Sequence, residues 1–350
     1  MRPRARFARS WMVRAVEAGG VAERPAWRAR TRMAIRRYAN IGTLVAVNLM
    51  WAAQYPAYKI ASEHMSPASM NFWTLLSSTM LLLPFLALQR RRNPGTAAKL
   101  DARSTFDFLL LGTLGILPPS LMLSWGIARS TASNAAIIQL TIPVLMVLLA
   151  MVVLGERVTV LRVGSLVIAL AGTVITSKGD LSGSSVTSTR LLVGNVVILL
   201  SGLGSAFYNT YAKKVLGRFG ELRVLIYTYV VGLSCCAVIS LFSDGPPFYV
   251  VTGYPSSVWA SLAVLGALTW GLAMALWMWV LKRLEAVQVS VSIYLLSIFG
   301  VLLSAATLGE RVRLPQIVGG LMVFAATFLT SEFENRREAA RQGAAVQVQE

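Results

Sequence analysis

The chain has 350 residues, of which 55% are hydrophobic and only 14% are charged. A soluble domain carries charge on about a quarter of its positions, so this composition is typical of a membrane protein. The formal net charge of +18 does not indicate nucleic-acid binding, because the basic residues gather in short clusters that flank long uncharged runs.

Residues 1–38 carry 11 of the 33 basic residues and no apolar periodicity. We predict a disordered basic tail, with Met33 as an alternative translation start because Met-Ala-Ile-Arg-Arg is an ordinary opening for a membrane protein. A secretory signal is not expected, since no apolar core follows the charges before residue 39.

Ten apolar runs follow, and each is long enough for a membrane-spanning helix, which needs about 20 residues. Helices satisfy all their backbone hydrogen bonds internally, as lipid requires, so we predict an all-α integral membrane protein. The expected spans are 39–57, 68–89, 106–127, 132–154, 159–177, 191–212, 223–243, 258–281, 286–308 and 314–331.

Lysine and arginine set the expected orientation, because cytoplasmic loops are enriched in both. If the N-terminus is cytoplasmic, the inner segments hold 27 of these residues and the outer segments hold 6. Both termini should therefore be cytoplasmic, in a multi-pass protein of the plasma (inner) membrane.

An internal repeat organises the chain. Gly155-Glu156-Arg157-Val158 recurs as Gly309-Glu310-Arg311-Val312, a shift of 154 residues, and the same shift aligns further residues over about fifty positions. We predict two units of five helices, 39–177 and 191–331, joined by an extracytoplasmic linker at 178–190 and followed by a cytoplasmic tail at 332–350. Five is an odd number, so the second unit enters the membrane inverted, and substrate sites of inverted repeats lie between the two units.

The residues now match a known family. Spans four and nine each end in Leu-Gly-Glu-Arg, span four contains Thr141-Ile142-Pro143-Val144 and span one contains Trp51. These features resemble the EamA repeat of the drug/metabolite transporter superfamily over roughly residues 40–331. The resemblance implies ten helices around a central cavity and transport of amino acids or other metabolites. The chain departs from the family pattern where Ser297 stands opposite Pro143, and where Ser69 to Trp73 lack an arginine.

Polar and aromatic side chains within the spans are the candidates for a substrate site, because amides and phenols in hydrocarbon turn toward the bundle or a wet cavity. Packing between helices and anchoring at the membrane interface are the alternatives. The predicted substrate-binding residues are Asn48, Trp51, Tyr55, Gln139, Tyr208, Asn209, Trp277, Ser290 and Tyr294.

A second set of residues is predicted to gate or bend the bundle. The prolines Pro118, Pro119 and Pro143 interrupt helical hydrogen bonding and serve as hinges or as passive kinks. Glu156 and Glu310 serve as gates or as turn caps, with the preceding glycine closing one helix and the carboxylate at the start of the next.

The expected function is alternating-access transport, in the export direction, of a small neutral, zwitterionic or aromatic metabolite that resembles an amino acid. Transport of a phosphorylated or nucleotide-linked sugar is an alternative that would need Lys59, Lys213 or Lys214, and a non-transporting receptor or scaffold is another. The sequence offers no catalytic motif, no metal site and no cofactor site, so we do not expect an enzyme. The expected partners are the substrate and the lipid bilayer, with no nucleic acid, and the chain is expected to be a monomer or homodimer.

Overall fold

The structure, a computed structural model, describes residues 42–92, 98–146, 149, 160–178, 185–243, 253–281 and 286–347. The residues from Thr43 onward belong to one compact unit. The predicted basic tail and Met33 lie outside the described residues, and so do Glu156 and its neighbours in the first Gly-Glu-Arg-Val.

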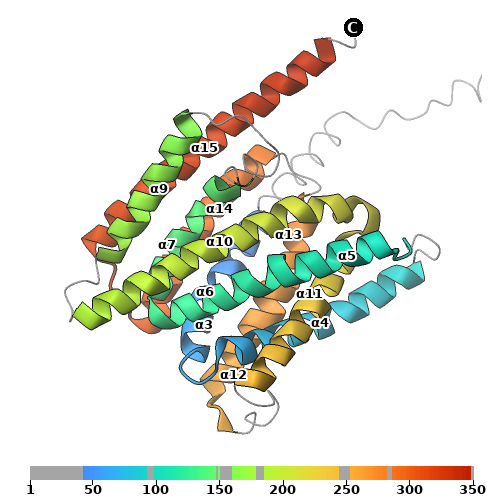
Figure 1. Ribbon diagram of the computed structural model, residues 1–350, viewed down its shortest axis with the longest axis horizontal. Coiled ribbons are helices and arrows are strands. Elements are labelled where there is room, and N and C mark those ends of the chain that lie inside the picture. Colours follow the sequence, from blue (N-terminus) through green and yellow to red (C-terminus); the bar gives the residue numbers. More distant parts are fainter. Residues whose placement is uncertain are drawn as a thin grey trace, which may run out of the picture. The chain divides into compact units, whose positions relative to one another are not determined.

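Every predicted span is helical in its described part except for a turn at Ala53, and no strand occurs in those segments (Figure 1). In the N-terminal half the labelled elements are α3 (Gln54–Ala61), α4 (Pro67–Arg92), α5 (Ala102–Leu110), η1 (Leu111–Ile116), α6 (Leu117–Arg129), α7 (Ala132–Ile138), η2 (Gln139–Thr141) and α9 (Val160–Lys178). In the C-terminal half they are α10 (Ser185–Phe219), α11 (Glu221–Ser243), α12 (Ser256–Ala263), η4 (Val264–Ala273), α13 (Met274–Leu281), α14 (Ala286–Leu308) and α15 (Leu314–Gln347).

Six helices among the described residues are long and apolar enough to cross a bilayer: 67–92, 102–129, 189–219, 221–243, 256–280 and 314–333. Shorter apolar helices cover 132–146, 163–176 and 294–308. The chain is therefore a multi-pass membrane protein, and the count of ten spans stays a prediction.

Two helices extend farthest beyond the predicted apolar spans. Helix α10 begins at Ser185, inside the segment predicted as a linker, and α15 continues to Gln347, past the predicted span end at residue 331. Hydropathy marks the part of a helix that lies in hydrocarbon, whereas the backbone remains helical through polar residues on either side.

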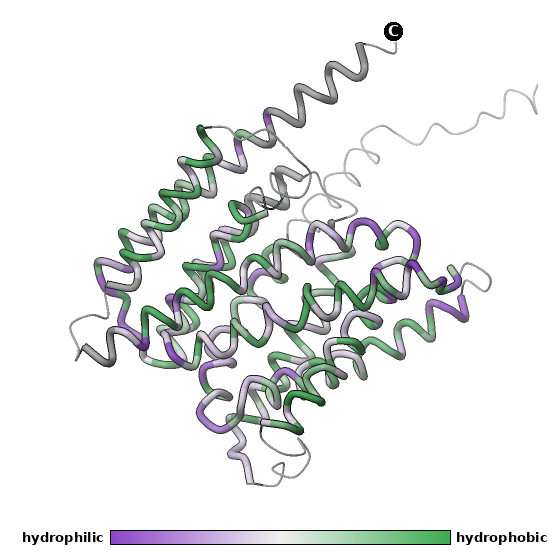
Figure 2. Tube along the Cα trace, viewed as in Figure 1, coloured by the Kyte–Doolittle hydropathy of each residue, from purple (hydrophilic) through white to green (hydrophobic). Residues whose placement is uncertain are grey.

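Large apolar side chains cover the outside of the bundle. Phe85, Leu302 and Leu321 are each more than half exposed, and in Figure 2 hydrophobic colour follows the helix middles while hydrophilic colour gathers near turns and helix ends. A soluble protein rarely exposes so much contiguous apolar surface. A bilayer satisfies this surface without any further packing.

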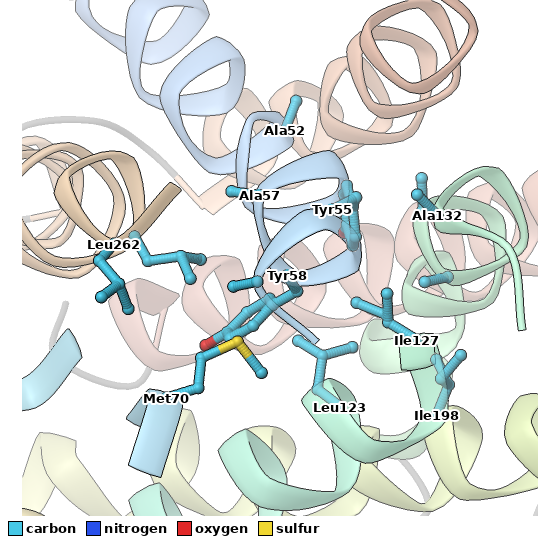
Figure 3. Packing of buried hydrophobic residues seen from close by; sticks show 14 of the residues in the cluster. Ala52, Tyr55, Ala57, Tyr58, Met70, Leu123, Ile127, Ala132, Ile198 and Leu262 are labelled. Atoms are coloured by element: carbon cyan, nitrogen blue, oxygen red, sulfur yellow. The ribbon is translucent and has the colours of Figure 1, made fainter. Parts of the chain in front are cut away.

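The interior is closely packed around α3 (Figure 3). Tyr55 and Tyr58 of α3 are fully buried and belong to one hydrophobic cluster with Leu123 and Ile127 of α6 and Leu262 of α12. Helix α3 continues a helical stretch over residues 43–52, with only Ala53 as a turn between them. Its burial in this cluster fixes its position in the bundle.

Two glycines form a reciprocal pair of close contacts. A Cβ at Gly112 would lie 2.4 Å from Cβ of Val231, and a Cβ at Gly266 would lie 3.0 Å from Cβ of Ser77. Gly266 is 154 residues after Gly112, and Val231 is 154 residues after Ser77. Each half of the chain thus gives the same glycine contact to the other half, as a two-fold relation between them would require.

Non-α backbone interrupts the third and eighth predicted spans. The π-helix η1 directly precedes the part of α6 that contains Pro118 and Pro119 as its second and third residues. The π-helix η4 covers the corresponding stretch of the second half although no proline follows it. The sequence predicted an interruption only at the prolines, whereas the structure places one in each half.

Candidate functional site

An internal cavity of ≈170 Å³ lies where α3, α6, α10 and α13 approach one another. One water needs at least about 10–15 Å³ by this measure, so the cavity has room for on the order of ten waters or one small metabolite. Its aromatic lining consists of Trp51, Tyr55, Tyr208, Trp270 and Trp277, and its polar lining consists of Gln54, Ser120, Gln139, Ser205, Asn209 and Thr269.

Most of the predicted substrate-binding residues line this cavity. They are Trp51, Tyr55, Gln139, Tyr208, Asn209 and Trp277. They come from four separate predicted spans, so tertiary packing of the bundle is what brings them to one place. Among the described residues of the lining, none is charged.

Three of the predicted substrate-binding residues are not among those that line the cavity. Asn48 is buried, but its Nδ2 donates to the carbonyl of Leu44 in its own helix at 2.8 Å, and it does not line the cavity. Tyr294 packs against Phe324, with ring centroids 4.6 Å apart. The side chain of Ser290 lies outside the described residues.

Two polar atoms of the lining have no hydrogen-bond partner among the described residues. They are Oη of Tyr55 and Oε1 of Gln139, and both are buried. The amide of Gln139 is oriented by Ser201, whose hydroxyl donates to the carbonyl of Ile198 at 2.6 Å and accepts from Nε2 of Gln139 at 3.1 Å. An unsatisfied buried polar group costs about 1–3 kcal/mol, so these atoms favour a ligand or water that donates to the amide oxygen.

The indoles of the cavity are held in fixed positions. The rings of Trp51 and Trp277 lie 4.9 Å apart between centroids, at 54° to each other. Nε1 of Trp270 donates to Oη of Tyr58 at 3.1 Å, and Oη of Tyr229 donates to the Trp270 carbonyl at 2.8 Å. Only Trp277 was predicted as a site residue, whereas Trp270 of the π-helix η4 also lines the cavity.

The irregular backbone also shapes the cavity. Gly115 and Ile116 of η1 and Pro119 of α6 line it on one side. A Cβ at Gly115 would lie 3.0 Å from the ring of Tyr208, so glycine allows that ring to approach. Pro118 and Pro143 are partly buried and do not line the cavity. Short π-helical segments occur frequently at functional sites.

Glu310 holds a helix end from the other half of the chain. Its carboxylate accepts the backbone N–H groups of Ala132 and Ser133, both at 2.9 Å, and the Ser133 hydroxyl at 2.6 Å. We call this arrangement the Glu310 clasp. Gly309, with φ +65°, closes α14 as predicted. The prediction that the Glu310 carboxylate lies at the start of the next helix is wrong, because α15 begins only at Leu314. Glu310 caps α7 instead.

Lys59 binds the C-terminal end of α6, the helix that precedes α7. Its ammonium donates to the carbonyls of Ile127 and Ser130, at 3.1 and 2.6 Å, near the C-terminus of α6. Helix α7 begins two residues after Ser130. A cation at a helix C-terminus and an anion at a helix N-terminus both complement the helix dipole. The turn between α6 and α7 is thus held from both sides.

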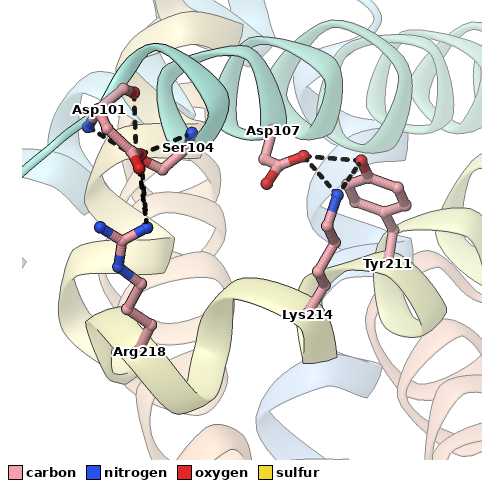
Figure 4. A network of polar contacts seen from close by, with 6 residues as sticks. All are labelled: Asp101, Ser104, Asp107, Tyr211, Lys214 and Arg218. Carbon is pink, nitrogen blue, oxygen red and sulfur yellow. Dashed lines mark hydrogen bonds and ion pairs between the residues drawn. The ribbon is translucent and has the colours of Figure 1, made fainter.

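A second polar network joins α5 to α10, away from the cavity (Figure 4). Asp107 accepts from Lys214 at 2.8 Å and from the hydroxyl of Tyr211 at 2.7 Å. Next to it, Asp101 accepts from Arg218 at 3.2 Å. Hydrogen bonds from the hydroxyl and then the backbone N–H of Ser104 lower the pKa of Asp101 to about 2.

The three lysines that a phosphorylated substrate would need do not reach the cavity. Lys59 and Lys214 are engaged as described above, and Lys213 is exposed. None of the three lines the cavity.

Comparison with known proteins places the chain among membrane transporters. A sequence model of the EamA-like transporter family matches it twice, over residues 40–178 and 192–332. A protein of Streptantibioticus cattleyicolor named "Probable terminal-alkyne amino-acid exporter" is 25% identical, covering 87% of this chain and 97% of that protein. The protein named "Uncharacterized transporter YcxC" of Bacillus subtilis is 28% identical over 77% of this chain and 91% of its own length.

A solved crystal structure has a similar fold. It superposes with a TM-score of 0.57 at 14% sequence identity and covers 86% of this chain and 99% of its own. An identity this low carries information about the fold alone. The two family matches together span well over half of the chain, and the chain therefore belongs to the EamA-like transporter family.

Proposed function

We propose that this transporter exports a small neutral, zwitterionic or aromatic metabolite, similar to an amino acid, through the cavity between α3, α6, α10 and α13. This proposal rests on the chemistry of the residues that line the cavity. It is lined by indoles, phenols and amides without a charge among its described residues, and it contains two buried acceptors without a partner there. The name of the Streptantibioticus relative points to the same substrate class.

We further propose alternating access by two inverted five-helix repeats, with ten transmembrane helices in total. The reciprocal contacts of Gly112 with Val231 and of Gly266 with Ser77 support a two-fold relation between the halves. The cavity draws its lining from both halves, so a rocking motion of one half against the other would change its access. The family matches 40–178 and 192–332 agree with this division.

The Glu310 clasp is proposed as the outer gate. It connects the segment after α14 to the start of α7, so it spans the two halves of the chain. The excess of basic residues in the opposite loops supports an extracytoplasmic position for the clasp, and we propose cytoplasmic termini and a location in the plasma membrane. In this proposal Glu310 does not bind substrate, and it stabilises the state that is closed to the outside.

The sugar-phosphate alternative has less support, because Lys59, Lys213 and Lys214 lie outside the cavity lining. A receptor role and nucleic-acid binding have no supporting feature among the described residues. A monomer or a homodimer is compatible with the proposed mechanism, since the described residues of one chain line the cavity on several sides.

A thermal-shift experiment with purified protein tests the substrate class. A ligand present at 100 times its Kd stabilises the folded state by about 2.7 kcal/mol. We expect at least one neutral or aromatic amino acid to raise the Tm, and sugar phosphates to leave it unchanged. Stabilisation by sugar phosphates alone would contradict the proposal.

A further inference from the structure

A second hollow, shallow and apolar, lies on the surface of the bundle away from the candidate site. Its volume is ≈470 Å³, and its apolar lining includes Pro67 of α4, Leu121 and Met122 of α6, Val197 of α10 and Ile239 of α11. These residues lie near the start of α4 and α10 and near the end of α6 and α11. In the predicted orientation, all four helix ends are at the extracytoplasmic side. We call this hollow the outer groove.

Two arginines lie next to the outer groove. The guanidinium of Arg129 is 3.5 Å above the ring centroid of Trp125, and that ring lines the groove. Arg190 is one helical turn before Gly194, where a Cβ would lie 3.1 Å from Cβ of Arg129. The two arginines are close enough to repel each other electrostatically. Neither forms an ion pair with a carboxylate in the described part of the chain.

This pairing of like charges is unusual for its location. The predicted outer segments hold only 6 of the 33 basic residues, and two of those 6 are Arg129 and Arg190. Lys59, another of the 6, has two carbonyl acceptors and feels the attraction of Glu310 and Glu63. Arg129 donates to the carbonyl of Trp125 at 3.4 Å. Neither arginine pairs with a carboxylate of the described residues, so an anion from outside the chain would relieve their repulsion.

We propose that the outer groove and the arginine pair bind one anionic phospholipid of the outer leaflet. The phosphate is held by Arg129 and Arg190, the glycerol region lies over Trp125, and an acyl chain occupies the apolar groove. Guanidinium groups suit phosphate because they donate two parallel, charge-assisted hydrogen bonds. The apolar lining suits an acyl chain, because in lipid the chain packs against it through van der Waals contacts and no polar group has to leave water.

The bound lipid would lie across the contact between α6 and α10. These helices approach closely there, since a Cβ at Gly126 would be 2.8 Å from the carbonyl oxygen of Gly194. Both helices also line the internal cavity. The lipid therefore stabilises the part of the bundle that holds this wall of the cavity, and this proposal does not depend on which substrate is transported.

Lipid-dependent stability of the detergent-purified protein tests the proposal. Phosphatidylglycerol and phosphatidylcholine with the same acyl chains are titrated in parallel, and native mass spectrometry counts the bound lipids. We expect a phosphatidylglycerol preference in the wild type. At about a factor of five per arginine, the Arg129→Gln/Arg190→Gln variant should lose that preference roughly 30-fold.

Matched variants separate the parts of the site. Arg311→Gln/Arg313→Gln removes the same charge from the same predicted face outside the groove and should keep the wild-type preference. Val197→Phe fills the groove and should weaken both lipids. Equal phosphatidylglycerol preference in wild type and Arg129→Gln/Arg190→Gln would overturn the proposal. Stabilisation by inorganic phosphate as strong as by the lipid would overturn the role of the groove.

Discussion

Replacement of Glu310 by glutamine tests whether the Glu310 clasp is a gate or a permanent cap. The wild-type carboxylate accepts three hydrogen bonds through its two oxygens. A glutamine keeps one acceptor oxygen, which can serve the N–H of Ala132, and places an amide donor against the two donors of Ser133. The change therefore removes two of the three contacts together with the negative charge at the N-terminus of α7.

The size of the effect follows from these contacts. A hydrogen bond to a charged group contributes about 1.5–3 kcal/mol when buried. Glu310 is only half-buried, so we expect a total loss of about 2 kcal/mol. If the clasp exists only in the outward-closed state, this loss shifts the equilibrium between the two states about 30-fold toward the open one. Ser133→Ala, which removes the hydroxyl contact alone, should give a smaller shift in the same direction.

Distance measurements between two spin labels can detect that shift. Labels at His64 and Arg311, both exposed, report on the predicted outer face after Cys235 and Cys236 are replaced by alanine. We expect one dominant distance in the otherwise unchanged protein and a second, longer distance in Glu310→Gln.

Glu332→Gln is the control for the distance measurement, because it removes only an exposed ion pair with Arg336. An unchanged distance distribution in Glu310→Gln, combined with a lower Tm, would show that the clasp is present in every state. The gate would then be refuted, and Glu310 would be a structural cap.

Three further predictions address the packing, the cavity and the charge network. Gly112→Ala should lower the free energy of unfolding by about 1–3 kcal/mol, because its Cβ would overlap Val231. The control Gly164→Ala has open space around it and should be neutral or slightly stabilising in the same denaturation assay. Gln139→Leu keeps the volume and removes the partnerless acceptor, so substrate affinity should fall about tenfold while the Tm does not fall; unchanged affinity would argue against this contact. The pKa of Asp101 is lowered in the folded protein, so its charge stabilises the fold above the unfolded pKa of about 4. This contribution disappears as the pH falls through about 2. In measurements of Tm against pH, Asp101→Asn should therefore be less stable than wild type at pH 7 and equal to it near pH 2.

The helices could be predicted from the sequence because each is an apolar run bounded by charges or turn residues. The helix ends could not, as α10 shows by beginning at Ser185. Polar flanks such as Ser185 to Arg190 carry no hydropathy signal, yet their backbone is helical. Propensity and neighbouring turns decide these ends, and hydropathy reports only the hydrocarbon segment.

The residues of the candidate site, too, could be predicted only in part. Asn48, Trp51 and Tyr55 follow i, i+3, i+7 spacing, which puts them on one helix face, and the last two line the cavity. Asn48 turns back to its own helix, because an amide can bond the carbonyl four residues earlier wherever that is the nearest acceptor. Thr269 and Trp270 were not among the predicted residues, although Trp270 is seven residues before Trp277 and a period of 3.6 therefore places both on one face.

The contact of Glu310 with α7 could not be predicted either. Its partners are 177 and 178 residues away in the sequence, and a carboxylate after a helix is expected to serve the next helix along the chain. Only the packing of the two halves determines which N-terminus lies within its reach.

The most direct test of the cavity as the transport pathway is flux through a version in which the cavity is filled. Wild-type protein and Ser205→Trp are reconstituted into liposomes, and release of a mixture of amino acids is followed by mass spectrometry. Ser234→Trp, a substitution at an exposed position on α11, is the matched control. We expect saturable release by the wild type and by Ser234→Trp, and none by folded Ser205→Trp. Wild-type release by Ser205→Trp would contradict the assignment of this cavity.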